Sequence, residues 1–165
     1  MLLPQTNPSR TVNMLKVKLL VPTAKMPTKA NATDFGLDLY SAQDIVVQSS
    51  IVDPATCNIP VSFNHATLVS TGIACEFLPW FGAIIRDRSG MATKTGLFVV
   101  AGIIDCDYRG EIKIAFRNLG EPYQIYVGDK IAQMILTPVV DMPIIKVEEL
   151  SKTIREASGF GESGR

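Results

Sequence analysis

The sequence has little of what most catalytic relays and metal sites need. Its 165 residues include one histidine, His65, and three cysteines, Cys57, Cys75 and Cys106. A single histidine argues against Ser-His-Asp and Cys-His relays, because both need an imidazole base. An odd number of cysteines without CxxC spacing indicates reduced thiols rather than a disulfide framework or a zinc site. We therefore expect a protein of the cytoplasm or another reducing intracellular compartment.

Excess charge and long apolar runs are also absent. Sixteen basic residues balance sixteen acidic ones, so the chain lacks the basic excess of proteins that hold nucleic acid through its phosphates. No apolar run approaches the roughly 18 residues that suggest a membrane-spanning helix. The first 13 residues lack the apolar stretch of a secretory signal. These absences predict a protein that is not secreted and that binds neither nucleic acid nor membrane.

The residues that are present are typical of β structure. Twelve glycines and ten prolines separate short segments rich in Val, Ile, Leu and Thr. We expect one all-β domain, a jelly-roll-like barrel or sandwich. One short internal helix is expected over residues 89–95, with Ser89 as its N-cap, and a long loop over residues 49–65. The predicted strands cover residues 15–21, 45–48, 67–75, 82–86, 97–101, 111–118, 124–126, 131–138 and 144–148.

The chain divides into three parts by composition. Residues 1–13 are expected to form a flexible tail, residues 14–149 the β domain, and residues 150–165 a mobile, glycine-rich arm. The arm contains the letters GxGxxG over residues 159–164. This match is not a dinucleotide fingerprint, because it ends one residue before the chain does and cannot open a helix of a βαβ unit.

Two polar clusters are candidates for chemistry. Residues 105–111, DCDYRGE, follow the most apolar segment of the chain, where an aspartate would be held rigidly and partly desolvated as a general base requires. An ordinary polar turn or a metal-binding aspartate pair explains the same letters. Residues 86–90, RDRSG, combine two guanidinium groups, a hydroxyl and main-chain amides, which suits an anion.

In order along the chain, five segments resemble the five motifs of the trimeric dUTPases. The segments are DFGLDLYSA (34–42), RSGMA (88–92), AGIIDCDYRG (101–110), GDKIAQ (128–133) and REASGFGESG (155–164). The resemblance implies a homotrimer of jelly-roll-like subunits with active sites shared between subunits. It implies hydrolysis of dUTP to dUMP and pyrophosphate with Mg2+, which keeps uracil out of DNA and supplies dUMP for dTMP synthesis.

The resemblance also implies roles for individual residues. Asp105 matches the general base that activates a water for attack on the α-phosphorus, and Asp38 matches the carboxylate that holds magnesium through its waters. Tyr108 matches the aromatic ring that packs under the deoxyribose. The main chain at Gly102, Ile103, Ile104 and Lys113 matches the hairpin that reads uracil, and Phe160 matches the ring that stacks on it. The phosphate-binding positions are Arg88, Ser89, Gly90, Gln133, Arg155 and Ser163.

Some positions depart from the family pattern. Glu162 places a carboxylate in the loop expected to cradle the terminal phosphates, and Asp87 stands where a proline is usual. Two alternatives share the fold. A dCTP deaminase would carry a glutamate three residues before Asn118, where this chain has Ala115. A nucleotide-sensing protein would use the same scaffold to bind a regulatory partner.

Overall fold

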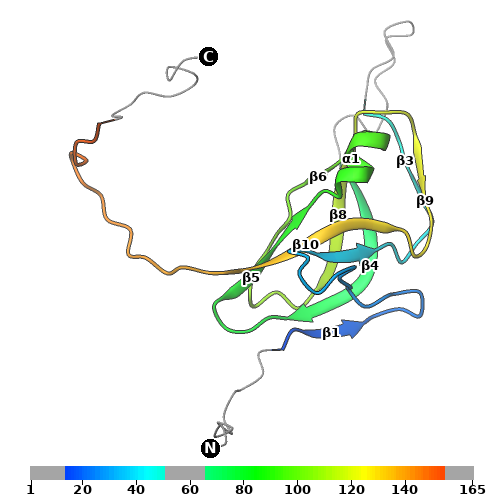
Figure 1. The fold of residues 1–165 in the computed structure, drawn as a ribbon, viewed down its shortest axis with the longest axis horizontal. Coiled ribbons are helices and arrows are strands. Elements are labelled where there is room, and N and C mark those ends of the chain that lie inside the picture. Colours follow the sequence, from blue (N-terminus) through cyan, green and yellow to red (C-terminus); the bar gives the residue numbers. More distant parts are fainter. Residues whose placement is uncertain (1–13, 51–65, 155–165) are drawn as a thin grey trace, which may run out of the picture.

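The computed structural model describes residues 14–50 and 66–154. In this part of the chain, strands predominate and one helix is present (Figure 1). The elements are β1 (Lys16–Leu19), β2 (Leu37–Tyr40), β3 (Ile45–Val47), β4 (Thr67–Glu76), β5 (Phe81–Arg86), α1 (Ser89–Thr95), β6 (Leu97–Val100), β7 (Ile103–Ile104), β8 (Glu111–Asn118), β9 (Tyr123–Ile125) and β10 (Lys130–Pro138).

The strands form two four-stranded sheets and one two-stranded sheet. The first sheet has the order β1-β4-β8-β6, the second has the order β2-β10-β5-β7, and β3 pairs with β9. Every pairing between these strands is antiparallel. The structure thus confirms the expectation of a mostly β fold with one short helix.

The two larger sheets share one apolar core. Along β8, Ile112, Ile114 and Phe116 are buried while Lys113 between them is exposed, which is the alternation that a pleated strand with one buried face requires. These side chains join a single cluster with residues of the second sheet such as Leu39 and Met134. Removing this apolar surface from water is the main force that holds the sheets together.

The helix α1 lies between β5 and β6 along the chain and starts one residue earlier than a Ser89 N-cap implies. Arg88, not Ser89, is the N-cap residue, with φ −84° and ψ 128°, and it makes no capping hydrogen bond through its side chain. The prediction of a Ser89 cap was wrong because Ser89 already has helical geometry. The helix ends at Gly96, which has φ 75°, and a Cβ there would lie 2.6 Å from the backbone nitrogen of Gly120.

Most predicted strands are confirmed, and three differences concern very short or unpaired segments. The sequence reasoning missed β2 and the two-residue β7. The strand predicted over residues 144–148 was wrong. There Ile144 is 98% exposed and Ile145 is 75% exposed, and the segment pairs with neither sheet. A β-strand needs a hydrogen-bonded neighbour, and within residues 14–50 and 66–154 no strand pairs with this segment.

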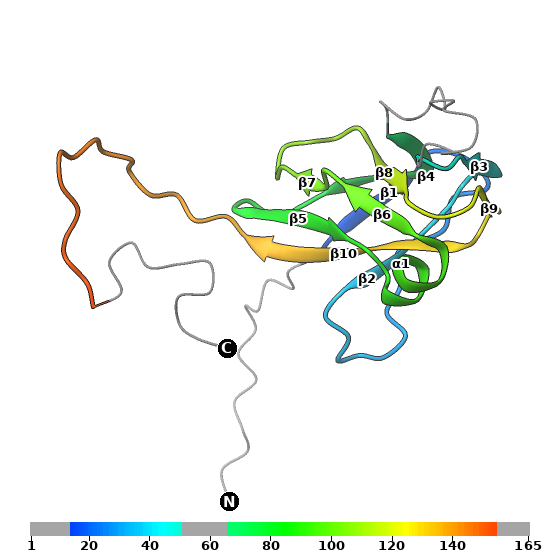
Figure 2. The same cartoon turned by 90° about the horizontal axis from the view of Figure 1, so that it is seen from above.

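Beyond β10 the chain leaves the body (Figure 2). Residues 139–154 are exposed throughout. The predicted tail over residues 1–13, most of the predicted arm and most of the predicted loop lie outside the described residues, so the proposed boundaries of these segments stay predictions.

The structure also describes two of the three cysteines and tests for a membrane-spanning helix. Cys75 and Cys106 are free thiols, and burial raises the pKa of the Cys75 thiol to about 11, so it is uncharged at neutral pH. Cys57 and His65 lie outside the described residues, and the expected reducing compartment stays a prediction. Within residues 14–50 and 66–154, no helix is long and apolar enough to cross a membrane.

Candidate functional site

The segment between β6 and β8 begins where the chain crosses from one sheet to the other. Ala101 and Gly102 have φ values of 64° and 111°, and β6 before them and β7 after them belong to different sheets. The Gly102 carbonyl accepts a hydrogen bond of 2.7 Å from the Ile85 N–H. A Cβ at Gly102 would lie 2.8 Å from the Ile85 carbonyl oxygen, so this close approach needs glycine.

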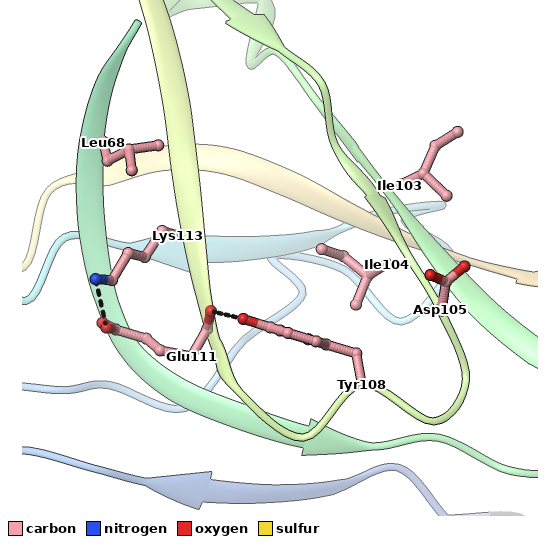
Figure 3. Close-up of a pocket in the computed structure, with 7 residues that line it drawn as sticks. All are labelled: Leu68, Ile103, Ile104, Asp105, Tyr108, Glu111 and Lys113. Atoms are coloured by element: carbon pink, nitrogen blue, oxygen red, sulfur yellow. Dashed lines mark hydrogen bonds and ion pairs between the residues drawn. The ribbon is translucent and has the colours of Figure 1, made fainter.

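The same segment forms one wall of an open pocket of about 450 Å³, which we call the Asp105 pocket (Figure 3). Asp105 follows β7 directly, and its carbonyl accepts a hydrogen bond from the Tyr108 N–H, which closes a tight turn. The Tyr108 hydroxyl donates to the Glu111 carbonyl at 3.0 Å. The lining residues are Leu68, Ile103, Ile104, Asp105, Tyr108, Glu111 and Lys113.

Asp105 itself is exposed in the single chain. The sequence had suggested a partly desolvated aspartate at the end of a buried strand, and this expectation was wrong for the isolated chain. The strand that precedes Asp105 is β7, a two-residue edge strand on which Ile103 is 81% exposed. The apolar segment that gave rise to the expectation includes β6, which ends before the crossing and of which only Leu97 is buried.

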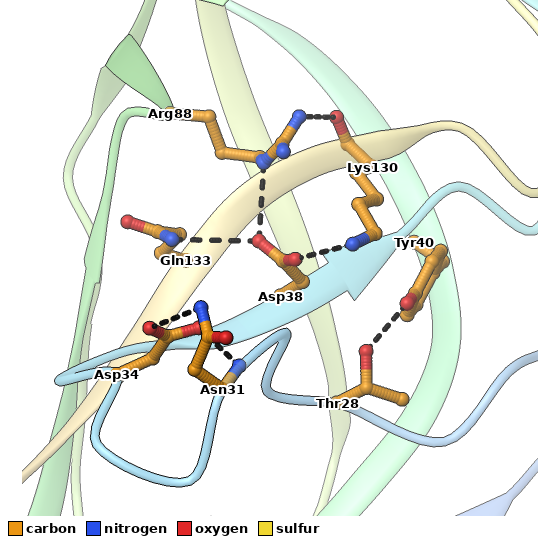
Figure 4. A network of polar contacts seen from close by, with 8 residues as sticks. All are labelled: Thr28, Asn31, Asp34, Asp38, Tyr40, Arg88, Lys130 and Gln133. Atoms are coloured by element: carbon orange, nitrogen blue, oxygen red, sulfur yellow. Dashed lines mark hydrogen bonds and ion pairs between the residues drawn. The ribbon is translucent and has the colours of Figure 1, made fainter. Parts of the chain in front are cut away.

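A second cluster, the Asp38 cluster, gathers polar groups from β2, β10 and the residue before α1 (Figure 4). Asp38 is only 5% exposed, and it lies opposite Gln133 in the register of β2 and β10. The Arg88 Nε lies 3.1 Å from Asp38 Oδ1, and the Lys130 Nζ lies 2.7 Å from Asp38 Oδ2. Gln133 Nε2 donates to Oδ1 at 3.4 Å, and Arg88 also donates to the Lys130 carbonyl.

The cations of the cluster keep Asp38 ionised. Burial raises the pKa of the Asp38 carboxyl group, but the Lys130 hydrogen bond and the charge of Arg88 lower it by more, so the pKa lies below its ordinary range. The same contact raises the pKa of Lys130. The cluster is therefore a fixed carboxylate between two fixed cations at neutral pH.

The cations of the Asp38 cluster extend into a groove beside α1. This groove has a volume of about 510 Å³, and its basic lining residues are Arg88, Lys94 and Lys130. Gly90 also lines it, and a Cβ at Gly90 would meet no atom within 4 Å, so the backbone there is open. Ser89 lies at the first position of α1, next to this surface. Such a groove suits an anion.

The pocket and the cluster lie at opposite edges of one sheet. Asp38 is on β2 and Asp105 follows β7, and these are the outer strands of the order β2-β10-β5-β7. Three strand spacings separate them, which is about 14 Å. No single contact within the described chain joins Asp105 to Arg88 or Gln133.

The residues proposed from the sequence therefore fall into three groups. Ile103, Ile104, Asp105, Tyr108 and Lys113 line the pocket, with Gly102 adjacent to it, whereas Asp38, Arg88 and Gln133 form the cluster, with Ser89 and Gly90 beside it. Arg155, Phe160 and Ser163 lie outside the described residues.

Sequence reasoning assigned no role to three residues that the structure brings to these places, although Glu111 ends the polar cluster at residues 105–111. Lys130 binds Asp38, and Leu68 and Glu111 line the pocket. Lys130 lies within the GDKIAQ motif, so its position was a usable signal. Leu68 and Glu111 become neighbours only through the pairing of β4 with β8, which no local motif reveals.

The comparisons with known proteins agree with this arrangement. The family model for dUTPase matches residues 22–164. The deoxyuridine 5'-triphosphate nucleotidohydrolase of Clostridium tetani is 42% identical over 154 residues, which cover 92% of this chain and 97% of that protein. The dUTPase of Staphylococcus bacteriophage 80alpha, solved with dUPNHPP, has a TM-score of 0.79 at 27% identity and covers 93% of this chain and 99% of its own.

A second solved structure is similar over a shorter part of the chain. It is a mutant dUTPase from phage phi11 of S. aureus, described with a structural Mg(II) ion, with a TM-score of 0.70 at 26% identity. The match covers 85% of this chain and 100% of that one. With a family model over most of its length and a relative above 40% identity, the chain belongs to the dUTPase family.

Proposed function

We propose that Asp105 is the general base of dUTP hydrolysis in this chain, activating a water for attack on the α-phosphorus. The overall reaction follows from the family and from relatives named for it: the chain is a dUTP diphosphatase that releases dUMP and pyrophosphate. The observation that carries the residue assignment is the Asp105 pocket, which places this carboxylate beside Tyr108 and the main chain of Ile103 and Ile104.

The pocket suits a deoxyuridine nucleoside. Tyr108 offers a ring, held by its hydroxyl at Glu111, on which a deoxyribose without a 2′-hydroxyl can pack. At the other wall β7 is an outer strand of its sheet, so main-chain groups at Gly102, Ile103 and Ile104 can pair with the edge of a uracil ring. Lys113 on β8 lies across the pocket from β7, beside Glu111 (Figure 3).

The Asp38 cluster and the adjoining groove suit the triphosphate. Arg88 and Lys130 supply fixed positive charge, Gln133 supplies an amide donor, and Ser89 and Gly90 supply a hydroxyl and open backbone at the start of α1. Neutralising the phosphate oxygens while leaving the α-phosphorus open to water is most of what this reaction needs. Arg155, Ser163 and Phe160 are proposed to complete the site from the arm.

Magnesium fits the Asp38 cluster only through water. Among the described residues no group of three or more His, Cys, Asp or Glu side chains could hold a metal ion directly. Asp38 Oδ1 receives Arg88 and Gln133, whereas Oδ2 receives only Lys130 and keeps room for a further donor. This is the donor set for a hydrated Mg2+ that is carried by triphosphate oxygens, and the bound ion would neutralise phosphate charge.

We further propose that the active form is a homotrimer of jelly-roll-like subunits that share sites. The position of the pocket and the cluster at opposite edges of one sheet supports shared sites, because two neighbouring copies can then each contribute one of them to the same substrate. The segment over residues 139–154, which leads into the arm, leaves the body with exposed Val140, Ile144 and Leu150, as expected of a segment that reaches another copy (Figure 2).

The experiment that tests the proposal combines substrates with one variant. Purified protein is incubated with Mg2+ and separately with dUTP, UTP, dTTP or dCTP, and nucleotide and pyrophosphate products are separated by chromatography. We expect efficient turnover of dUTP alone. The Asp105→Asn variant should keep dUTP binding and lose at least about a hundredfold in kcat, the usual scale for a positioned base.

Each other outcome has a defined meaning. An active Asp105→Asn enzyme would place the base elsewhere, and comparable turnover of UTP or dTTP would contradict the pocket assignment. Conversion of dCTP to a uracil nucleotide would favour the deaminase alternative. That reaction lacks its expected glutamate here, because the corresponding β8 position is Ala115.

A further inference from the structure

An irregularity in β4 lies directly behind the Asp105 pocket. Ser70 is opposite Lys113 and Ala74 is opposite Glu111, so four steps along β4 correspond to two steps along β8. Gly72, in the middle, has φ +66°, and a Cβ there would lie 2.6 to 3.0 Å from side-chain atoms of three neighbouring residues. The extra residues of such a bulge cannot all use the regular hydrogen bonds of the ladder, so they need other partners.

The carboxylate of Glu111 is the partner of this bulge. Its Oε1 accepts a hydrogen bond from the Ser70 hydroxyl and another, of 2.9 Å, from the Gly72 N–H. Its Oε2 lies 3.6 Å from the Lys113 ammonium group. Burial raises the pKa of Glu111, but the hydrogen bonds from Ser70 and Gly72 lower it by more, so the side chain is ionised at neutral pH.

Glu111 also contacts the other side of the pocket through its main chain. The Glu111 carbonyl accepts the Tyr108 hydroxyl at 3.0 Å (Figure 3). Tyr108 lies across Gly110, where a Cβ would lie 2.4 Å from the tyrosine oxygen. One residue therefore holds the aromatic wall with its backbone and the β4 wall, where Leu68 lines the pocket, with its side chain.

We propose that Glu111 is a positioning residue: its carboxylate holds the β4 bulge closed and thereby fixes the width of the Asp105 pocket for a 2′-deoxyribonucleoside. This inference rests on the proposed role of the pocket in binding the nucleoside. It adds a residue that touches no reacting atom and acts on selectivity through Ser70, Gly72 and Tyr108. The hydrogen bonds of Glu111 go to Ser70, Gly72 and Tyr108 and not to Asp105. Loss of the Glu111 carboxylate should therefore weaken dUTP binding more than it slows the chemical step.

The test compares Glu111→Ala with Glu111→Gln. The alanine variant leaves the Gly72 N–H without its acceptor, and we expect KM for dUTP to rise about tenfold while kcat changes by less than about threefold. The preference for dUTP over UTP in kcat/KM should fall by a similar factor. Because an amide oxygen can still accept from Ser70 and Gly72, Glu111→Gln should restore both quantities to within about threefold of the native values.

A matched control shows whether losing any carboxylate from the paired strands β4 and β8 has the effect expected of Glu111→Ala. Glu76, at the end of β4, is exposed and pairs with Lys16 at 2.6 Å, away from the pocket. Glu76→Ala should leave KM and the dUTP preference unchanged. Amide hydrogen exchange at Gly72 provides the direct readout of the bulge, and it should speed up in Glu111→Ala and not in Glu111→Gln.

Three results would overturn the proposal. One is faster exchange at Gly72 with unchanged KM and unchanged selectivity. The second is a Glu111→Gln enzyme as impaired as Glu111→Ala. That result would show that the negative charge of Glu111 matters, and not its hydrogen bonds with Ser70 and Gly72. If Glu111→Ala does not fold, Ser70→Ala is tested in its place. The third overturning result is a Ser70→Ala enzyme whose KM for dUTP and preference for dUTP over UTP are unchanged. Failure of the proposed function is distinct from all of these, because the native enzyme would then not prefer dUTP.

Discussion

At the residue scale, the Asp38 cluster depends on one buried carboxylate. Asp38 holds Arg88, Lys130 and Gln133 in place, and its pKa lies below the ordinary range because the cations outweigh the effect of burial. Without Asp38, two like charges would face each other with no counter-charge between them. Asp38 thus orders the groups that are proposed to meet the triphosphate even before any ligand binds.

The first prediction concerns this carboxylate and pH. Asp38→Asn should lower the free energy of unfolding at pH 7 by about 1–3 kcal/mol, the scale of hydrogen bonds to a charged group. Because the folded-state pKa is lowered, the contribution of Asp38 is complete above about pH 4, near the ordinary pKa of aspartate. It is lost as the pH falls through the folded-state value.

Denaturant unfolding at a fixed protein concentration, at pH 7 and at steps below pH 4, measures this difference. The stability of the native protein should approach that of Asp38→Asn as the pH falls. Asp141 is an exposed aspartate in the segment that follows β10, so Asp141→Asn is the control and should show no difference from the native protein at any pH. A pH-independent gap between the native protein and Asp38→Asn would contradict the electrostatic explanation.

At the scale of elements, the segment after β10 and the arm that follows it contribute to the protein in a different way from the strands. Val139 still bonds to the Trp80 carbonyl, but the residues that follow are exposed. A segment with so little buried surface contributes little to the stability of its own subunit. Its proposed contribution is to the site, through Arg155, Phe160 and Ser163.

The second prediction is that deleting residues 154–165 separates stability from turnover. The melting temperature of the truncated protein should lie within about 2 °C of the native value, because this segment is polar and glycine-rich in sequence and offers little apolar surface to bury. The value of kcat for dUTP should fall at least about tenfold, because closing segments order substrates for reaction. Calorimetry and steady-state kinetics measure the two effects, and undiminished turnover would remove the arm from the mechanism.

Sequence patterns correctly predicted elements and site residues that depend on contacts between residues close together in the chain. The apolar-rich segment between Gly110 and Gly120 predicted β8 at its true bounds, Glu111–Asn118, and the polar cluster at residues 105–111 holds both Asp105 and Tyr108 of the pocket. The two-residue β7 is too short to carry a period. The segment 144–148 has strand-forming residues, but a strand also needs a partner that sequence alone does not show.

Contacts between distant segments account for the rest. The pairing of Glu111 with Ser70 spans 41 residues and depends on a bulge in β4, so no motif indicated it. The partial burial expected for Asp105 failed for a related reason, because the chain crosses between sheets just before that residue. Such features depend on how the strands pair across the whole fold.

At the scale of the whole molecule, the central claim is that one substrate spans two sites held apart in each subunit. The Asp105 pocket would take the nucleoside from one copy, and the Asp38 cluster would take the phosphates from another. Heterologous contacts close into a ring when the rotation between copies allows it, so the proposed trimer would have an equivalent site at every interface. The assembly is then part of the catalytic mechanism.

Subunit mixing tests this claim most directly. Asp105→Asn and Arg88→Ala chains carrying different tags are co-expressed, the mixed trimers are purified through both tags, and kcat for dUTP is compared with that of each variant alone. Each variant alone should be nearly inactive, whereas a mixed trimer should regain about one intact site in three, because one interface then combines a native pocket with a native cluster. Mixed trimers no more active than the parent variants would contradict the account and place the complete site within one chain.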